Sequence, residues 1–166
     1  MKKVNKKGGF TLIEILVVIG IIAVLAAIVI IAINPARQFA QARNTQRTSN
    51  ANAILNAIGQ RMADNKGLFR TTSDATCTLA MDLPIPLGVS TISEAAKNLR
   101  PCLVPTYIPE LPVDPTNGTN DCDDTCSGAT TYNTNYTVQV DNNGRVKVCA
   151  PTLEASLGNA EICVTR

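Results

Sequence analysis

One uninterrupted apolar stretch constrains this chain more than any other feature. From Phe10 to Ile33 only Thr11 and Glu14 have polar side chains, and the last nineteen residues contain no charge and no side-chain amide. In a helix of about 1.5 Å per residue those nineteen residues extend roughly 28 Å, close to the hydrocarbon thickness of a bilayer. Because backbone in lipid must satisfy its own hydrogen bonds, we expect a single membrane-spanning helix.

The flanks of the stretch argue against a secretory signal peptide. A signal peptide has small residues at a cleavage site after its apolar region, whereas Gly8 and Gly9 come before it. The four lysines of residues 1–9 favour a cytoplasmic location for this end and an external one for everything after Ile33. Glu14 is a candidate functional residue, since a carboxylate within an apolar span costs about 2.5–3.5 kcal/mol near the bilayer centre and less near the interface.

The segment from Gly8 to Glu14, GGFTLIE, resembles the class III signal of type IV pilins and pseudopilins. In that family a short basic leader ends in glycine, and the mature chain begins with phenylalanine and has glutamate at its fifth position. The resemblance implies cleavage after Gly9 by a membrane prepilin peptidase, N-methylation of Phe10 and assembly into a helical filament. Pro35 is a departure, because many pilins have a proline inside the apolar stretch rather than after it.

Pattern and resemblance together predict an α+β chain with the type IV pilin fold. One long N-terminal helix, with a membrane-spanning half and an amphipathic half, should pack on a small antiparallel β-sheet domain with disulfides. We expect a cleaved basic leader (1–9), a transmembrane and filament-core helix (10–33), its amphipathic continuation (34–65) and a globular head (66–166).

The amphipathic continuation has a clear helical period. Its apolar positions recur at spacings of three, four, seven and eleven: Ala51, Ile54, Leu55, Ile58 and Met62. Polar side chains, including those of Arg43 and Arg47, are expected on the other side of the helix. Pro35 predicts a kink in this otherwise continuous helix, and Gly67 suits the C′ position at its end.

The end of the chain has the pattern of a small sheet. Asn143-Gly144 predicts a hairpin between residues 136–140 and a strand that contains Val146 and Val148. Residues 161–165 predict a third strand, and the apolar face of the sheet should cover the Ile54, Ile58 and Met62 side of the helix.

The first part of the head has a different pattern. Residues 79–89 contain two prolines and indicate an irregular stretch. Thr91-x-x-Glu94 resembles a capping box, and it predicts a short helix that ends before Pro101.

Residues 107–115 carry a second, shorter resemblance. Tyr107-Ile108 and the sequence LPVDP at 111–115 resemble the YI…LPxDP turn of major pseudopilins and related pilins. Some pseudopilins bind calcium after this turn, and four carboxylates here are candidate ligands: Asp114, Asp121, Asp123 and Asp124. Because the spacing is not that of an EF-hand, we favour a solvated loop and no metal.

All six cysteines follow the apolar stretch, and an even number in an oxidising compartment indicates disulfides. Six cysteines allow fifteen connectivities. We favour Cys77–Cys102, Cys122–Cys126 and Cys149–Cys163. A zinc site of Cys122, Cys126, Cys149 and Cys163 is the less favoured alternative, because the chain has no histidine and no paired C-x-x-C units.

The composition argues against catalysis and against nucleic-acid binding. Without histidine, a glycine-rich phosphate loop or an HExxH motif, we expect neither an enzyme nor a cofactor. After loss of the leader, eleven Lys and Arg face thirteen Asp and Glu, whereas a phosphate-binding protein normally has a basic surplus. A local basic patch remains an alternative, formed by Arg61, Lys66, Arg70 and Lys97.

These observations predict a structural pilin subunit of a type IV pilus or related filament. After cleavage the new amine of Phe10 is cationic, and the Glu14 carboxylate of a neighbouring copy is its expected partner. Other expected partners are further copies, the peptidase, the assembly machinery of the inner membrane and, before assembly, the membrane itself. The final location is an extracellular filament or the cell envelope. Alternatives are a pseudopilin of a type II secretion system and a membrane-anchored binding module such as a DNA-uptake pilin.

Overall fold

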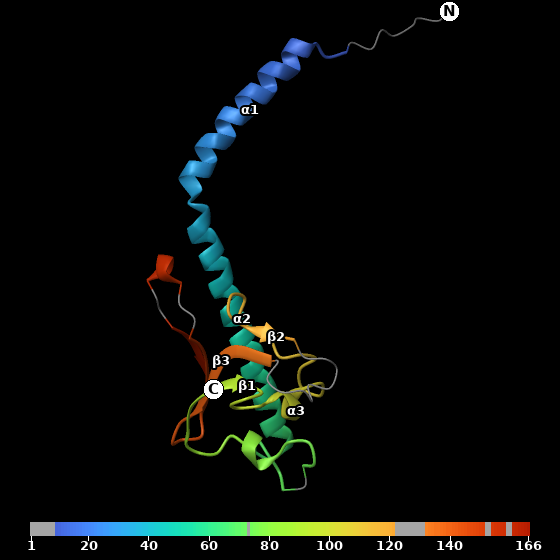
Figure 1. Cartoon of the computed structure of the whole chain (residues 1–166), viewed down its shortest axis with the longest axis vertical. Helices are drawn as coiled ribbons and strands as arrows, with labels where there is room; N and C mark the ends of the chain where they lie inside the picture. The colour runs from blue at the N-terminus through green and yellow to red at the C-terminus, as the bar shows by residue number, and fades with distance from the viewer. Residues whose placement is uncertain (1–8, 73, 122–131, 152–153, 159–160) are drawn as a thin grey trace, which may run out of the picture. The chain divides into compact units, whose positions relative to one another are not determined.

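A computed structural model describes residues 9–72, 74–121, 132–151, 154–158 and 161–166. The chain divides into two compact units, unit 1 from Met1 to Phe39 and unit 2 from Ala40 to Arg166. Unit 1 contains one helix and the first turn of a second. Unit 2 combines the rest of the second helix with an antiparallel sheet (Figure 1).

The expected α+β architecture with a long N-terminal helix is confirmed, and at Pro35, where a kink was expected, the helix is interrupted. Helix α1 (Leu12–Ile33) ends at Asn34, and helix α2 (Pro35–Asp64) begins directly after it. Asn34 has a left-handed φ of 48°, and its backbone and side-chain oxygens accept from the Arg37 amide at 3.1 and 3.4 Å. Pro35 explains the interruption, because it offers no N–H to the carbonyl of Ile31 and its fixed φ suits a first helical position.

The predicted apolar face of α2 is confirmed. Ala51, Ile54 and Ile58 are fully buried, Leu55 is buried and Met62 is half-buried. They pack in one core with the inward-facing side chains of the sheet. This packing, rather than helix propensity, stabilises the second half of α2.

The end of α2 differs from the prediction by one position. The Gly67 amide donates to the carbonyl of Met62 at 2.7 Å, and the Lys66 amide donates to Ala63 at 3.4 Å. These two bonds define a Schellman motif in which Lys66, not Gly67, occupies the C′ position. Lys66 accordingly has a left-handed φ of 57°, which costs a residue with a Cβ about 1–2 kcal/mol.

Strands of the described residues form one antiparallel sheet, which confirms the predicted hairpin and third strand. Their spatial order is β1-β3-β4-β5, and β2 also pairs with β3. The bounds are β1 (Leu87–Ser93), β2 (Thr119–Asn120), β3 (Tyr132–Val140), β4 (Val146–Ala150) and β5 (Ile162–Thr165). The β3–β4 turn is a three-residue loop closed between Asp141 and Arg145, with Gly144 at φ 80°.

The first part of the head departs from the sequence prediction. Strand β1 covers residues that were expected to be irregular or to cap a helix, and Thr91 pairs with Thr137 of β3. The helix there, α3 (Arg100–Leu103), begins where the predicted helix should have ended. Pro101 fits because it lies in the first turn, where its missing N–H has no intrahelical partner to lose. Short 3₁₀ turns are η1 (Leu79–Met81) and η2 (Ala155–Leu157).

Two of the expected disulfides are present in unit 2. Cys77–Cys102 joins the loop after α2 to α3, and Cys149–Cys163 joins opposite residues of β4 and β5. The expected Cys122–Cys126 bond lies outside the described residues. The Cys149–Cys163 bond removes two of the four thiolates on which the zinc alternative depended.

Candidate functional site

The residues around the expected processing site form a compact polar start to α1. Thr11 is the N-cap, and the Glu14 amide donates to its Oγ1 at 3.3 Å. In return Glu14 Oε2 accepts from the Thr11 amide at 2.8 Å and from Thr11 Oγ1 at 2.7 Å. This reciprocal capping box satisfies donors at the helix start, and it orients the carboxylate toward residues 9–11.

The rest of α1 exposes its apolar side chains. Phe10 is 84% exposed, and large hydrophobic residues from Leu12 to Ile31 are all at least half exposed. The helix is long and apolar enough, by length and composition, to cross a membrane between Leu12 and Ile31. An apolar surface of this extent has to be covered by lipid or by protein.

Comparison with protein families matches residues 4–33 to the prokaryotic N-terminal methylation motif. The segment carries a class III signal. The match supports a pilin-like or pseudopilin protein, a class of structural rather than enzymatic chains. Comparison with curated proteins and with solved structures found no match. The class III signal implies processing by prepilin peptidase and assembly, and Gly9, Phe10 and Glu14 lie within the matched residues.

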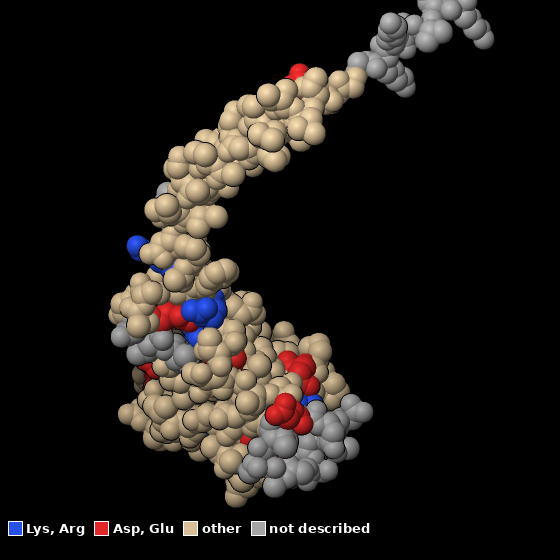
Figure 2. Space-filling view, turned by 45° about the horizontal axis from the view of Figure 1, so that its top comes forward, with Lys and Arg blue, Asp and Glu red and all other residues tan. Residues whose placement is uncertain are grey.

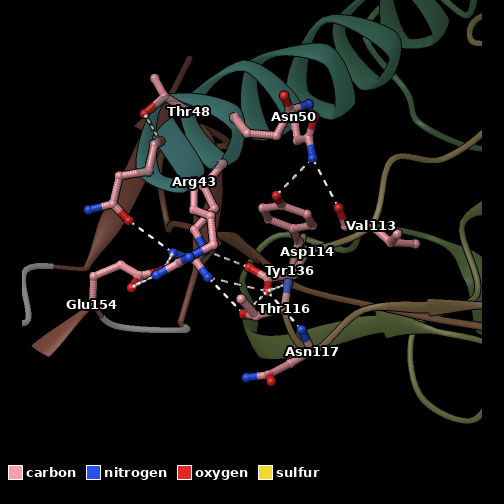
Figure 3. A network of polar contacts seen from close by, with 12 residues as sticks. Arg43, Thr48, Asn50, Val113, Asp114, Thr116, Asn117, Tyr136 and Glu154 are labelled. Atoms are coloured by element: carbon pink, nitrogen blue, oxygen red, sulfur yellow. Dashed lines mark hydrogen bonds and ion pairs between the residues drawn. The ribbon is translucent and has the colours of Figure 1, made fainter. Parts of the chain in front are cut away.

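A second polar cluster, in unit 2, joins α2 to the LPVDP turn (Figure 3). Arg47 is completely buried, and its Nε donates to Asp114 Oδ2 at 2.7 Å. Its Nη2 donates to Thr116 Oγ1 at 2.9 Å, and its Nη1 donates to Asn44 Oδ1 at 2.9 Å and Glu154 Oε1 at 2.6 Å. A buried guanidinium with this many acceptors is fully paired, so its burial is tolerated.

The Asp114 carboxylate is equally well satisfied. Besides the Arg47 pair, its Oδ1 accepts from the amides of Thr116 and Asn117 at 2.9 and 3.0 Å. The Thr116 hydroxyl donates to the same oxygen at 2.7 Å. Burial raises the pKa of Asp114, but the Arg47, Thr116 and Asn117 hydrogen bonds outweigh it and lower the pKa to about 2.

The β4–β5 connection reaches the same cluster through Glu154. Arg43 donates to both oxygens of this carboxylate at 2.7 Å, and Arg47 donates to one of them. Hydrogen bonds from Arg43 and then Arg47 lower the pKa of Glu154 to about 2. The positive charges of Arg43 and Arg47 therefore balance the negative charges of Asp114 and Glu154, and these ion pairs hold Glu154 against α2.

Asn50 extends the cluster into the core. Its Nδ2 donates to the carbonyl of Val113 at 3.0 Å and to the buried hydroxyl of Tyr136 at 3.1 Å (Figure 3). Gly118 closes the turn, since its amide donates to the Asp114 carbonyl at 3.0 Å. A Cβ at Gly118 would lie 2.5 Å from the Asp114 amide nitrogen, so a residue without a side chain is required there.

The cluster corrects the expected position of one residue, Arg47. Arg47 was expected on the polar side of α2, yet it lies four residues before Ala51 on the buried side. Asp114, a candidate ligand only in the less favoured calcium alternative, has a guanidinium partner. Asp121 is exposed at the edge of the described chain, and Asp123 and Asp124 lie outside it. Continuing the apolar period of α2 toward its N-terminus would have identified Arg47.

The proposed basic patch is not a free surface. Arg61 is 6% exposed, donates to the carbonyls of Phe69 and Cys102 at 2.7 and 2.5 Å, and pairs with Asp74. Two further members are also hydrogen-bonded: Arg70 donates to the carbonyl of Cys77, and Lys97 donates to the carbonyls of Ala80 and Asp82. The fourth member, Lys66, is exposed. On the face of unit 2 in Figure 2, most of the surface is uncharged and basic atoms lie beside acidic ones.

Proposed function

We propose that this chain is a structural pilin subunit that assembles through its N-terminal helix into a type IV pilus or related filament. The observation that carries the proposal is the class III signal at the start of an exposed apolar helix. Residues 1–9 are removed by prepilin peptidase, and Phe10 becomes the methylated first residue. The apolar helix then leaves lipid and packs against helices of other copies. Because lipid is as apolar as the helix surface, the stability of the assembled state depends on close packing between helices more than on hydrophobicity.

Glu14 supplies the specific contact of assembly. The capping box uses its Oε2, while Oε1 has no hydrogen-bond partner among the described residues. The amine of Phe10 in an incoming copy bonds Oε1, because an unpaired charge in a water-free filament core is costly. The pair sets the axial register of each new copy.

The test compares Glu14→Ala with Glu14→Asp in cells that express the chain as their filament subunit. We expect both variants to be cleaved after Gly9, with Glu14→Ala giving no filaments and Glu14→Asp keeping part of assembly. Mass spectrometry of the membrane fraction reports cleavage and methylation, and electron microscopy of sheared fibres reports assembly. Normal filaments from Glu14→Ala would refute the pairing, and fibres whose subunit begins at Met1 would refute the proposal.

A pseudopilin of a type II secretion system is the second candidate, supported by the LPVDP turn. If the chain is a pseudopilin, the role of this turn is to join the globular head to α2 through the buried ion pair of Asp114 with Arg47. Short envelope-bound filaments and loss of protein export after deletion would favour this function. Long surface fibres would favour the pilus.

A further inference from the structure

The junction between α1 and α2 leaves polar backbone groups that a continuous helix would pair. Pro35 has no N–H for the carbonyl of Ile31. The Arg37 amide, which a continuous helix would direct to Ile33, bonds Asn34 instead. Unpaired carbonyls are costly in hydrocarbon and cost little where water or lipid headgroups reach them. The junction therefore suits the outer edge of the hydrocarbon layer.

The length of α1 agrees with this location. The twenty residues from Leu12 to Ile31 extend about 30 Å, which matches the hydrocarbon thickness of a bilayer. A span that starts at Leu12 therefore ends close to Asn34. The structure and the length of the helix place the same residues at the membrane surface.

The residues just after the junction have side chains suited to a lipid interface. Arg37 is exposed, and Phe39 is 65% exposed although it is a large aromatic residue. Both belong to unit 1, together with α1. A long cationic side chain at the end of a span reaches lipid phosphates, and an exposed aromatic ring inserts among headgroups and upper acyl chains.

We propose that residues 34–39 form an anchor at the outer surface of the membrane that α1 spans. In this anchor the Arg37 guanidinium binds lipid phosphates and Phe39 inserts at headgroup level. The anchor fixes the depth at which the chain waits in the bilayer before assembly. This inference rests on the proposed function, because it requires α1 to span the membrane. Its partner is the outer lipid surface rather than a neighbouring copy.

The experiment uses Phe39→Trp in the full chain, which has no tryptophan of its own. The variant is reconstituted into phosphatidylcholine–phosphatidylglycerol vesicles whose lipids carry bromine either near the glycerol end or near the methyl end of the acyl chain. Val24→Trp in the middle of α1 is the matched deep probe. Free N-acetyltryptophanamide in the same vesicles is the unquenched reference.

We expect the indole fluorescence of Phe39→Trp to be quenched more by shallow than by deep bromine, with the opposite order for Val24→Trp. Adding Arg37→Leu to Phe39→Trp should increase quenching by deep bromine, because the cation no longer holds the segment at the phosphates.

Two kinds of result separate the anchor from the proposed function. Quenching of Val24→Trp but not of Phe39→Trp, or stronger deep than shallow quenching of Phe39→Trp, would overturn the anchor and leave the spanning helix intact. An unquenched Val24→Trp variant would overturn both the anchor and the membrane-spanning part of the proposed function.

Discussion

Arg47 of α2 and Asp114 of the LPVDP turn form an ion pair that no solvent reaches, with 2.7 Å between Nε and Oδ2. The two residues lie 67 positions apart, so the pair joins the helix to the loop that precedes β2. Because both charges are buried away from water, each is stabilised mainly by the other. We therefore expect unit 2 to be sensitive to substitution of either residue alone.

Arg47→Met should destabilise unit 2 by about 3–5 kcal/mol, because it leaves the Asp114 carboxylate buried without a cation. Urea denaturation of the detergent-solubilised chain at neutral pH, followed by near-ultraviolet circular dichroism, measures the loss. Arg43→Met is the matched control, since Arg43 is partly exposed and contacts only Glu154 among the carboxylates. Adding Asp114→Leu to Arg47→Met should restore part of the loss. Similar midpoints for the two single variants would contradict the role given to the buried pair.

Acid should destabilise unit 2 through the two carboxylates of this cluster. The pKa values of Asp114 and Glu154 are both about 2 in the folded chain, below the ordinary values of about 3.9 and 4.3. Lowered carboxylate pKa values contribute stability that is fully present above the ordinary values and is lost as pH falls toward 2. The urea midpoint should therefore fall steeply between about pH 5 and pH 2.

Glu154→Gln provides the control for this pH dependence. The variant should have a lower midpoint at neutral pH and a shallower fall in acid, because one of the two titrating groups is gone. Parallel pH profiles for the variant and the unmodified chain would show that Glu154 does not contribute.

Gly118→Ala should destabilise the LPVDP turn by about 1–3 kcal/mol, because the new methyl group meets backbone that has to shift. It would lie 2.6 Å from Val113 Cβ and 2.8 Å from the Asp114 carbonyl oxygen. Gly88→Ala is the matched control, as nothing lies within 4 Å of the corresponding Cβ in β1. Thermal denaturation of both variants measures the difference, and a melting temperature for Gly118→Ala equal to that of the control would be inconsistent with the tight turn.

Lys66→Gly should stabilise unit 2 by about 1 kcal/mol, since glycine adopts the left-handed C′ conformation without a Cβ penalty. Lys66→Ala separates this effect from loss of charge, because alanine keeps the Cβ and removes the ammonium. We expect the glycine variant to melt above the unmodified chain and the alanine variant to melt no higher than it. Equal gains for both variants would point to charge instead of backbone conformation.

Several features of this protein were predictable because they depend on neighbouring residues. The apolar stretch, the stripe from Ala51 to Met62 and the hairpin at Asn143-Gly144 each follow from a local period or turn preference. The pairs Cys77–Cys102 and Cys149–Cys163 were also expected, although only their presence in the structure selects them from fifteen connectivities.

Other features were wrong or incomplete because long-range contacts outweigh local preference. Residues 87–93 become β1 because β3 offers an edge to pair with, which overrides the capping-box pattern of Thr91 and Glu94. Lys66 takes the left-handed position because the packed end of α2 fixes where the chain must turn.

The sequence by itself determined the N-terminal segment: four lysines, GGFTLIE and an apolar run define its chemistry without any tertiary partner. Only the tertiary structure decided that Arg47, Asp114 and Glu154 meet. The attraction between these charges outweighs the cost of burying them only once α2, the LPVDP turn and the β4–β5 connection surround them. Charges in a linear sequence do not reveal which of them will lose their water.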